Sequence, residues 1–213
     1  MSSGGFTFRS RLYPIADTLG DSARSHADIA AAMVHAGVRF LQLRVKDRSS
    51  GDFADIARAV KRVTDSVHAT LIVNDRADIA KLVDADGVHL GQDDLPATAA
   101  RALLGDRKII GLSTHTLEQA EHAARGEPVD YIAFGPIFST TSKGRPDPVQ
   151  GLAALGAVRR RVSLPLVAIG GITAASMPAV LTAGADAVAM IGEIVNAPSV
   201  DAKVRELLRL DKS

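Results

Sequence analysis

The chain has 213 residues with a hydrophobic content of 46% and a charged content of 23%, values typical of a globular protein with a sizeable core. Its 25 basic and 24 acidic side chains nearly cancel, which argues against nucleic acid or an anionic membrane surface as a partner. The absence of cysteine excludes disulfides and thiolate chemistry, and no apolar run reaches the roughly 18 residues of a membrane span. We therefore expect a cytoplasmic protein, with a flexible polar tail over residues 1–10 that lacks the apolar core of a signal peptide.

Short apolar runs alternate with longer segments of helical periodicity along the rest of the chain. The predicted strands are LYPIA (12–16), FLQLR (40–44), TLIVN (70–74), GVHL (87–90), IIGLS (109–113), YIAF (131–134), LVAIG (166–170) and AVAM (187–190). Strands that alternate with helices predict βαβ units and a parallel sheet. Eight such units predict a single-domain (β/α)8 TIM barrel over residues 11–213, with a doubly wound sheet as the alternative.

A weak internal repeat supports the barrel. The stretches GVRFLQL (37–43), DADGVHL (84–90), PVDYIAF (128–134) and GADAVAM (184–190) align without gaps and include strands two, four, six and eight. Because each interior layer of a barrel is filled from alternate strands, the aligned Gln42, His89, Ala133 and Ala189 are predicted to share one inward-facing layer. In that layer, His89 is best interpreted as a hydrogen-bonded core histidine.

Polar side chains follow several predicted strands at the rim where the active sites of such barrels lie. Arg44 and Lys46 follow strand two, and Lys143 ends the hydroxyl-rich loop after strand six; such cations suit phosphate or diphosphate oxygens.

Asp75 and Asp94 follow adjacent strands, so they could share one Mg²⁺, although Asp93-Asp94 by itself is an ordinary loop pair. Gly170-Gly171 and Gly192 lie where barrels commonly bind a phosphate through backbone N–H groups, although two glycines alone more often make a turn.

Seven stretches together resemble the thiamine-phosphate synthase family in order, spacing and position, from about residue 12 to residue 194. They are QLRVK (42–46), LIVNDR (71–76), DGVHLGQDDLP (86–96), GLSTHT (111–116), GPIFSTTSK (135–143), VAIGGI (167–172) and GADAVAMI (184–191). The resemblance implies a transferase that joins hydroxymethylpyrimidine diphosphate to a thiazole phosphate and releases diphosphate. It also implies Mg²⁺ as cofactor and a dissociative mechanism through a pyrimidine carbocation, while a homodimer is left open.

The resemblance assigns a role to each matching residue. It implies pyrimidine-diphosphate contacts for Gln42, Arg44, Lys46 and Asn74, Mg²⁺ ligands in Asp75 and Asp94, and diphosphate contacts for Ser113 and Lys143. It implies thiazole-phosphate contacts for Thr140, Ser142, Gly171, Ile191 and Gly192. Arg44, Lys46, Ser113 and Lys143 would then be the catalytic residues.

The chain departs from the family pattern at four positions. Val45 replaces a usual Glu, Ser139 a usual Pro, Ser142 a usual Thr and Gly192 a usual Ser. The last change removes one hydroxyl from the expected phosphate pocket.

Three alternatives remain open. A related thiazole tautomerase would carry His in place of Pro136. A non-catalytic phosphate-binding barrel would not need the paired aspartates. A phosphosugar isomerase would need an acid/base pair that the rim lacks.

Overall fold

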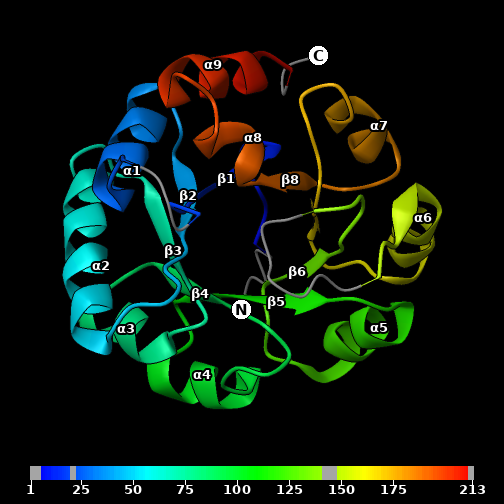
Figure 1. Ribbon diagram of the computed structural model, residues 1–213. Coiled ribbons are helices and arrows are strands. Elements are labelled where there is room, and N and C mark those ends of the chain that lie inside the picture. The colour runs from blue at the N-terminus through cyan, green and yellow to red at the C-terminus, as the bar shows by residue number, and fades with distance from the viewer. Residues whose placement is uncertain (1–5, 20–22, 141–147, 211–213) are drawn as a thin grey trace.

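Eight parallel strands form a closed barrel in the computed structural model, which describes residues 6–19, 23–140 and 148–210 (Figure 1). The strands are β1 (Leu12–Ala16), β2 (Phe40–Leu43), β3 (Thr70–Asn74), β4 (Gly87–Leu90), β5 (Ile109–Thr114), β6 (Tyr131–Phe134), β7 (Leu166–Ile169) and β8 (Ala187–Met190). They pair in sequence order, and β8 pairs with β1. The barrel prediction is confirmed, and the predicted strands differ from the observed ones by one residue at the ends of β2, β5 and β7.

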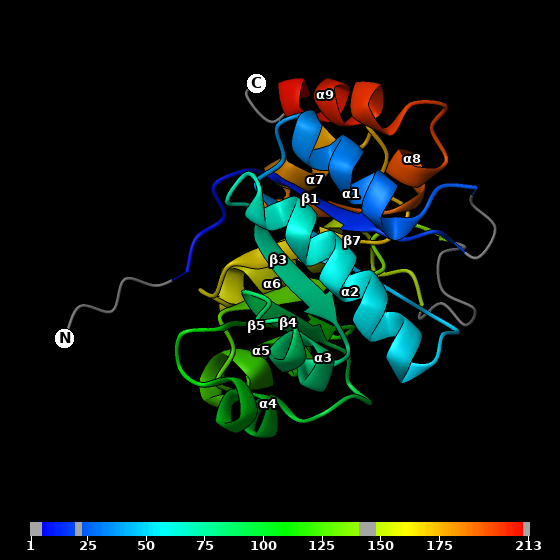
Figure 2. The same cartoon turned by 90° about the vertical axis from the view of Figure 1, so that its left-hand side faces the viewer.

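The longer helices surround the barrel as an outer layer, and the short α8 lies inside this ring, next to β8 (Figures 1 and 2). They are α1 (His26–His35), α2 (Ser50–Asp65), α3 (Ala77–Leu82), α4 (Ala97–Leu104), α5 (Leu117–Gly126), α6 (Gly151–Arg161), α7 (Met177–Thr182), α8 (Gly192–Val195) and α9 (Val200–Leu210). Local sequence sets several of their starts: Ser25 and Asp28 form a capping box on α1, and Ser49 caps α2. No helix in the described part of the chain is long and apolar enough to cross a membrane.

The internal repeat corresponds to a repeated contact between neighbouring strands. Asp86, Asp130 and Asp186 hold the same place in the repeat, and each carboxylate accepts a backbone N–H from β3, β5 or β7 at 2.7–2.8 Å. Arg101 on α4 pairs with Asp130, and Arg159 on α6 pairs with Asp186. The repeat therefore fixes the register at the amino-terminal end of three strand pairs.

The predicted interior layer is confirmed by the strand register. Pairing through β3 places Gln42 level with Gly87, which lies two residues before His89. The same offset of two residues separates His89 from Ala133, Ala133 from Ala189, and Ala189 from Gln42. A shift of one residue per strand is the tilt of an eight-stranded barrel with shear eight, so the four residues lie at one height. Gln42 and His89 are buried at this level, and the two small alanines leave room for them.

Aromatic rings close the amino-terminal end of the barrel, opposite the rim that carries the predicted site. Phe6 and Phe8 pack on the interior cluster, with ring centroids 5.7 and 5.3 Å from Tyr131, and Phe8 lies 5.3 Å from Phe40. These two phenylalanines lie in the segment predicted to be a flexible tail. That description does not fit them, because apolar rings at the open end of a barrel are removed from water by packing there. Tyr13 completes this aromatic floor.

Candidate active site

The basic side chains that follow β2 reach acidic partners on neighbouring strands. Arg44 Nη1 donates to Asp17 Oδ2, and Lys46 Nζ lies 2.5 Å from Asp75 Oδ2. Gln42 faces inward instead, and its Nε2 donates to Tyr13 Oη at 3.0 Å. Gln42 therefore lies in the barrel interior, whereas Arg44 and Lys46 lie at the carboxyl-terminal rim.

Asp17 is a rim residue that the sequence analysis missed. It directly follows β1, and only 4% of its surface is exposed. One carboxylate oxygen holds Arg44, and the other accepts the Leu19 N–H at 2.7 Å. The available signal was its position, because a charged residue directly after a buried strand is the same pattern that singled out Asp75.

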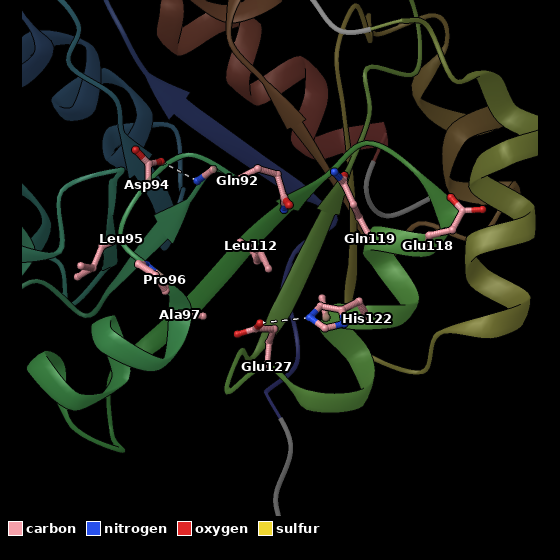
Figure 3. A pocket seen from close by; sticks show the side chains of 12 residues that line it. Gln92, Asp94, Leu95, Pro96, Ala97, Leu112, Glu118, Gln119, His122 and Glu127 are labelled. Atoms are coloured by element: carbon pink, nitrogen blue, oxygen red, sulfur yellow. Dashed lines mark hydrogen bonds and ion pairs between the residues drawn. The ribbon is translucent and has the colours of Figure 1, made fainter.

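Asp75 lies at the rim in contact with both Lys46 and Asp94. Asp75 has a left-handed backbone with φ of +63° and donates its N–H to His89 O at 2.7 Å, while Asp94 Oδ2 accepts the Gly91 N–H at 2.7 Å (Figure 3). Burial raises the pKa of Asp94, and the facing Asp75 carboxylate adds to that rise. A shared divalent cation would relieve this repulsion, and Mg²⁺ typically takes one or two protein carboxylates with water and phosphate oxygens. The described residues contain no group of three or more His, Cys, Asp or Glu that could hold a metal.

His89 and Ser113 meet beneath this rim. His89 Nε2 lies 2.9 Å from Ser113 Oγ, and His89 Nδ1 lies 2.9 Å from Tyr131 Oη. Burial lowers the pKa of His89 to about 4, against an opposing effect of the Asp75 charge, so the imidazole is neutral at pH 7. This agrees with the interpretation of His89 as a hydrogen-bonded core histidine. Asn74, buried at the end of β3, is the ladder partner of His89.

The predicted phosphate-binding glycines lie under the loop that follows β6. The Phe138 N–H donates to Gly170 O at 3.0 Å, and both Gly170 and Gly171 have positive φ values. A β-carbon on Gly171 would lie 2.3 Å from Ser139 O, so the loop backbone itself requires glycine there. Thr140, at the end of the described part of this loop, is half-buried.

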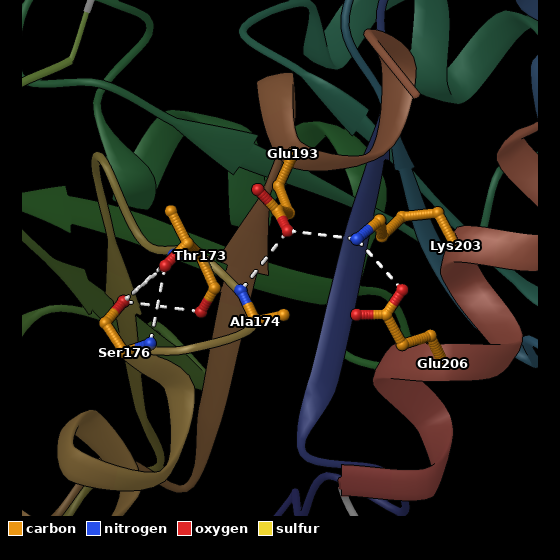
Figure 4. A network of polar contacts seen from close by, with 6 residues as sticks. All are labelled: Thr173, Ala174, Ser176, Glu193, Lys203 and Glu206. Carbon is orange, nitrogen blue, oxygen red and sulfur yellow. Dashed lines mark hydrogen bonds and ion pairs between the residues drawn. The ribbon is translucent and has the colours of Figure 1, made fainter. Parts of the chain in front are cut away.

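Glu193 connects the segments that follow β7 and β8. It comes directly after Gly192 and accepts the Ala174 N–H at 3.3 Å and Lys203 Nζ at 3.3 Å (Figure 4). Lys203 also pairs with Glu206, so α9 supports this end of the rim. The sequence analysis passed over Glu193 because its partners are distant along the chain.

Two of the predicted site residues lie outside the part of the chain that the structure describes. Ser142 and Lys143 lie outside the described residues, since the structure omits 141–147. Ile191 directly follows β8 as the cap of α8, and Gly192 is the first residue of that helix. The predicted phosphate contacts after β8 therefore belong to the same rim as the paired aspartates.

A cavity of about 400 Å³ lies outside the barrel, between the loop after β4 and α5 (Figure 3). Its lining includes Asp94 and Gln92 from the rim, with Leu112, Glu118 and His122 farther out. Leu112 lies on the helix-facing side of β5, because Ser113, its neighbour, bonds to the interior His89. This cavity therefore borders the rim without being the predicted substrate site.

Comparisons with known proteins identify the family of this chain. The family model described as thiamine monophosphate synthase matches residues 12–194. A thiamine-phosphate synthase of Pelotomaculum thermopropionicum is 48% identical over 185 residues, which cover 86% of this chain and 84% of the relative, and one of Chloroflexus aurantiacus is 42% identical over 94% of this chain and 92% of the relative. The solved thiamine phosphate pyrophosphorylase of Pyrococcus furiosus is 31% identical, with a TM-score of 0.83 and 95% of both chains covered. The chain belongs to the thiamine-phosphate synthase family and is a transferase of thiamine biosynthesis.

Proposed function

We propose that this chain joins hydroxymethylpyrimidine diphosphate to a thiazole phosphate, with thiamine monophosphate and diphosphate as products. The observation that carries the proposal is the meeting of Lys46 with the Asp75–Asp94 pair at the rim, in a chain of this family. This cluster offers fixed charges where a diphosphate would leave. The tautomerase and the non-catalytic barrel are not favoured, because the matching family model and relatives are those of the synthase.

The proposed reaction has two steps. The bond between the pyrimidine methylene carbon and the diphosphate oxygen breaks first, and the electron pair leaves with diphosphate. The thiazole nitrogen then attacks the methylene cation with its lone pair and forms the new carbon–nitrogen bond. No proton has to be removed from that nitrogen, so the reaction needs no general base.

The chain's residues would act mainly on the developing negative charge. Arg44 and Lys46 would bind diphosphate oxygens, Ser113 would donate its hydroxyl, and Lys143 would add a third cation. Asp75 and Asp94 would hold Mg²⁺, which neutralises the departing diphosphate when bound. Arg44 comes pre-oriented by Asp17, which supports a role in fixed electrostatic stabilisation.

The two organic groups would occupy opposite sides of the rim. Gln42 and Asn74 would contact the pyrimidine from below. Thr140, Ser142, Gly171, Ile191 and Gly192 would contact the thiazole phosphate, with Glu193 supporting the last of these. A cytoplasmic location and a homodimer are further proposals, and light scattering after size-exclusion chromatography tests the dimer.

An assay with both substrates and Mg²⁺, monitoring thiamine monophosphate, tests the proposed function. We expect turnover that requires both substrates. Absence of product from the folded protein, with each substrate and Mg²⁺ at saturating concentration, would contradict the proposal.

A further inference from the structure

Five side chains form an unbroken row of hydrogen bonds across the barrel interior. Gln42 Nε2 contacts Tyr13 Oη at 3.0 Å, and Tyr13 Oη contacts Tyr131 Oη at 2.9 Å. Tyr131 Oη contacts His89 Nδ1 at 2.9 Å, and His89 Nε2 contacts Ser113 Oγ at 2.9 Å. The two ends are proposed substrate contacts, whereas the three middle residues have no role in the proposed function.

The hydrogens of this row can be counted. The two tyrosine hydroxyls and the His89 ring are buried and bond only to uncharged groups, so each hydroxyl has one hydrogen and the uncharged imidazole has one N–H. Because Gln42 donates to Tyr13, the Tyr13 hydrogen must go to Tyr131 and the Tyr131 hydrogen to His89 Nδ1. The His89 hydrogen then lies on Nε2 and points to Ser113.

If one hydrogen bond of the row is reversed while Gln42 still donates to Tyr13, a buried hydroxyl is left without an acceptor. If His89 carried its hydrogen on Nδ1, Tyr131 would have to turn its own hydrogen toward Tyr13. Tyr13 already accepts from Gln42, so the Tyr13 hydrogen would lose its partner in a fully buried position. A buried polar group without a partner is disfavoured strongly enough to select one direction.

The reverse direction satisfies every hydrogen only if the Gln42 amide is turned around. Ser113 would then donate to His89 and would have only lone pairs left for a ligand. Lone pairs cannot bond the oxygens of an anion, so only the direction that starts from the Gln42 amide makes Ser113 a donor to diphosphate. In the same direction Gln42 Oε1, which bonds none of the described residues, is left to accept from an amino group on the pyrimidine.

We infer that Tyr13, Tyr131 and His89 are positioning residues that make Ser113 a fixed hydrogen-bond donor toward the leaving diphosphate. The same row connects that donor to the proposed pyrimidine contact at Gln42. The bond at the centre of the row joins Tyr13 and Tyr131, which are 118 residues apart in the sequence. The role of the donor rests on the proposed function, whereas the direction of the row is a property of the free protein.

Nitrogen NMR of the free protein tests the direction without any substrate. The chain has six histidines, and the His89 signals can be assigned by their loss in His89→Asn. We expect His89 to carry its hydrogen on Nε2 at pH 7, and the Nδ1-protonated form to appear in Tyr131→Phe, where the donor to Nδ1 is gone. A wild-type His89 protonated on Nδ1, or averaged between the two forms, would overturn the inference.

A double-mutant cycle tests the coupling to Ser113. Tyr131→Phe should lower kcat by about tenfold in the wild-type background but by less than about twofold in Ser113→Ala, because Tyr131 acts through Ser113. His89→Asn, which removes the imidazole that contacts Ser113, should behave in the same way if Tyr131→Phe folds poorly. Equal effects in the two backgrounds would overturn the positioning role.

Thr64→Val provides a matched control for loss of a buried hydroxyl. Thr64 is fully buried on α2 and bonds Lys61 O at 3.0 Å, away from the interior row. We expect less than about a twofold change in kcat in either background. If the enzyme lacks synthase activity altogether, the proposed function fails, while the NMR result still decides the direction of the row.

Discussion

Asp17 holds the Arg44 guanidinium at the rim of the barrel, and both side chains are largely removed from solvent. The Arg44 charge is thereby compensated before any substrate binds. A cation fixed in this way loses little conformational entropy when it binds a diphosphate, which is the arrangement expected for electrostatic stabilisation.

Replacement of Asp17 should therefore affect both stability and binding. Asp17→Asn keeps the acceptor for the Leu19 N–H but replaces the carboxylate that Arg44 contacts with a neutral amide, so we expect a loss of about 3 kcal/mol in the free energy of unfolding and a higher KM for the pyrimidine diphosphate. Urea unfolding and steady-state kinetics measure the two effects. Asp55→Asn, in the exposed Asp55–Arg58 pair, is the control and should change stability by less than about 0.5 kcal/mol.

The carboxylate pair should make activity depend on metal. We expect EDTA to abolish turnover, and Asp75→Asn or Asp94→Asn to lower kcat by at least about 100-fold, because each removes charge from the proposed Mg²⁺ site. The adjacent exposed carboxylate in Asp93→Asn is the matched control, with nearly normal kcat expected. Full turnover in EDTA would remove the metal from the mechanism.

Two glycines at the phosphate end should respond differently. In Gly171→Ala the new β-carbon meets Ser139 O in a left-handed backbone, so we expect the thiazole-phosphate KM to rise by at least about tenfold. Gly192→Ser adds one neutral hydrogen bond at most, so its KM should change by roughly tenfold or less with kcat nearly unchanged. An unchanged thiazole-phosphate KM in Gly171→Ala would mean that the pocket lies elsewhere.

The aromatic floor should contribute to stability without affecting chemistry. Phe8 packs on Tyr13, Phe40 and Tyr131 while remaining half-buried, so Phe8→Ala should cost about 2 kcal/mol of unfolding free energy, less than a fully buried ring. Thr7→Ala changes an exposed neighbour and should be neutral. Equal unfolding midpoints for the two variants would show that the floor is not stabilising.

Acid should destabilise the fold through buried histidines. Burial lowers the pKa of His89 to about 4 and also lowers that of His26, so the unfolded chain binds protons at a higher pH than the folded one. The two neutral histidines therefore do not reduce the free energy of unfolding above about pH 6.5. Below that pH the unfolded chain takes up protons first, so the free energy of unfolding falls as the pH approaches the folded pKa. His89 alone should remove about 2 kcal/mol between pH 6.5 and 5, before most carboxylates titrate. Urea unfolding at several pH values measures this, and a flat profile in that range would contradict it.

The sequence by itself determined the barrel, the strand positions and the rim on which the polar residues lie. Apolar runs that alternate with helical periodicity can be buried on both faces only as parallel strands under helices, and the direction of the strands then places residues such as Asp75 and Asp94 at one end. The repeat even determined the layer that contains Gln42 and His89, because register follows from the same two-residue alternation.

Only the tertiary structure decided which polar groups are partners. Asp17 with Arg44, Glu193 with Lys203, and Tyr13 with Tyr131 are joined by barrel closure or by helix packing, not by local pattern. Phe6 and Phe8 likewise look like part of a polar tail until the open end of the barrel is present to receive them. Hydrogen bonds depend on distances of a few tenths of an ångström between residues far apart in sequence, and those distances exist only once the chain has closed on itself.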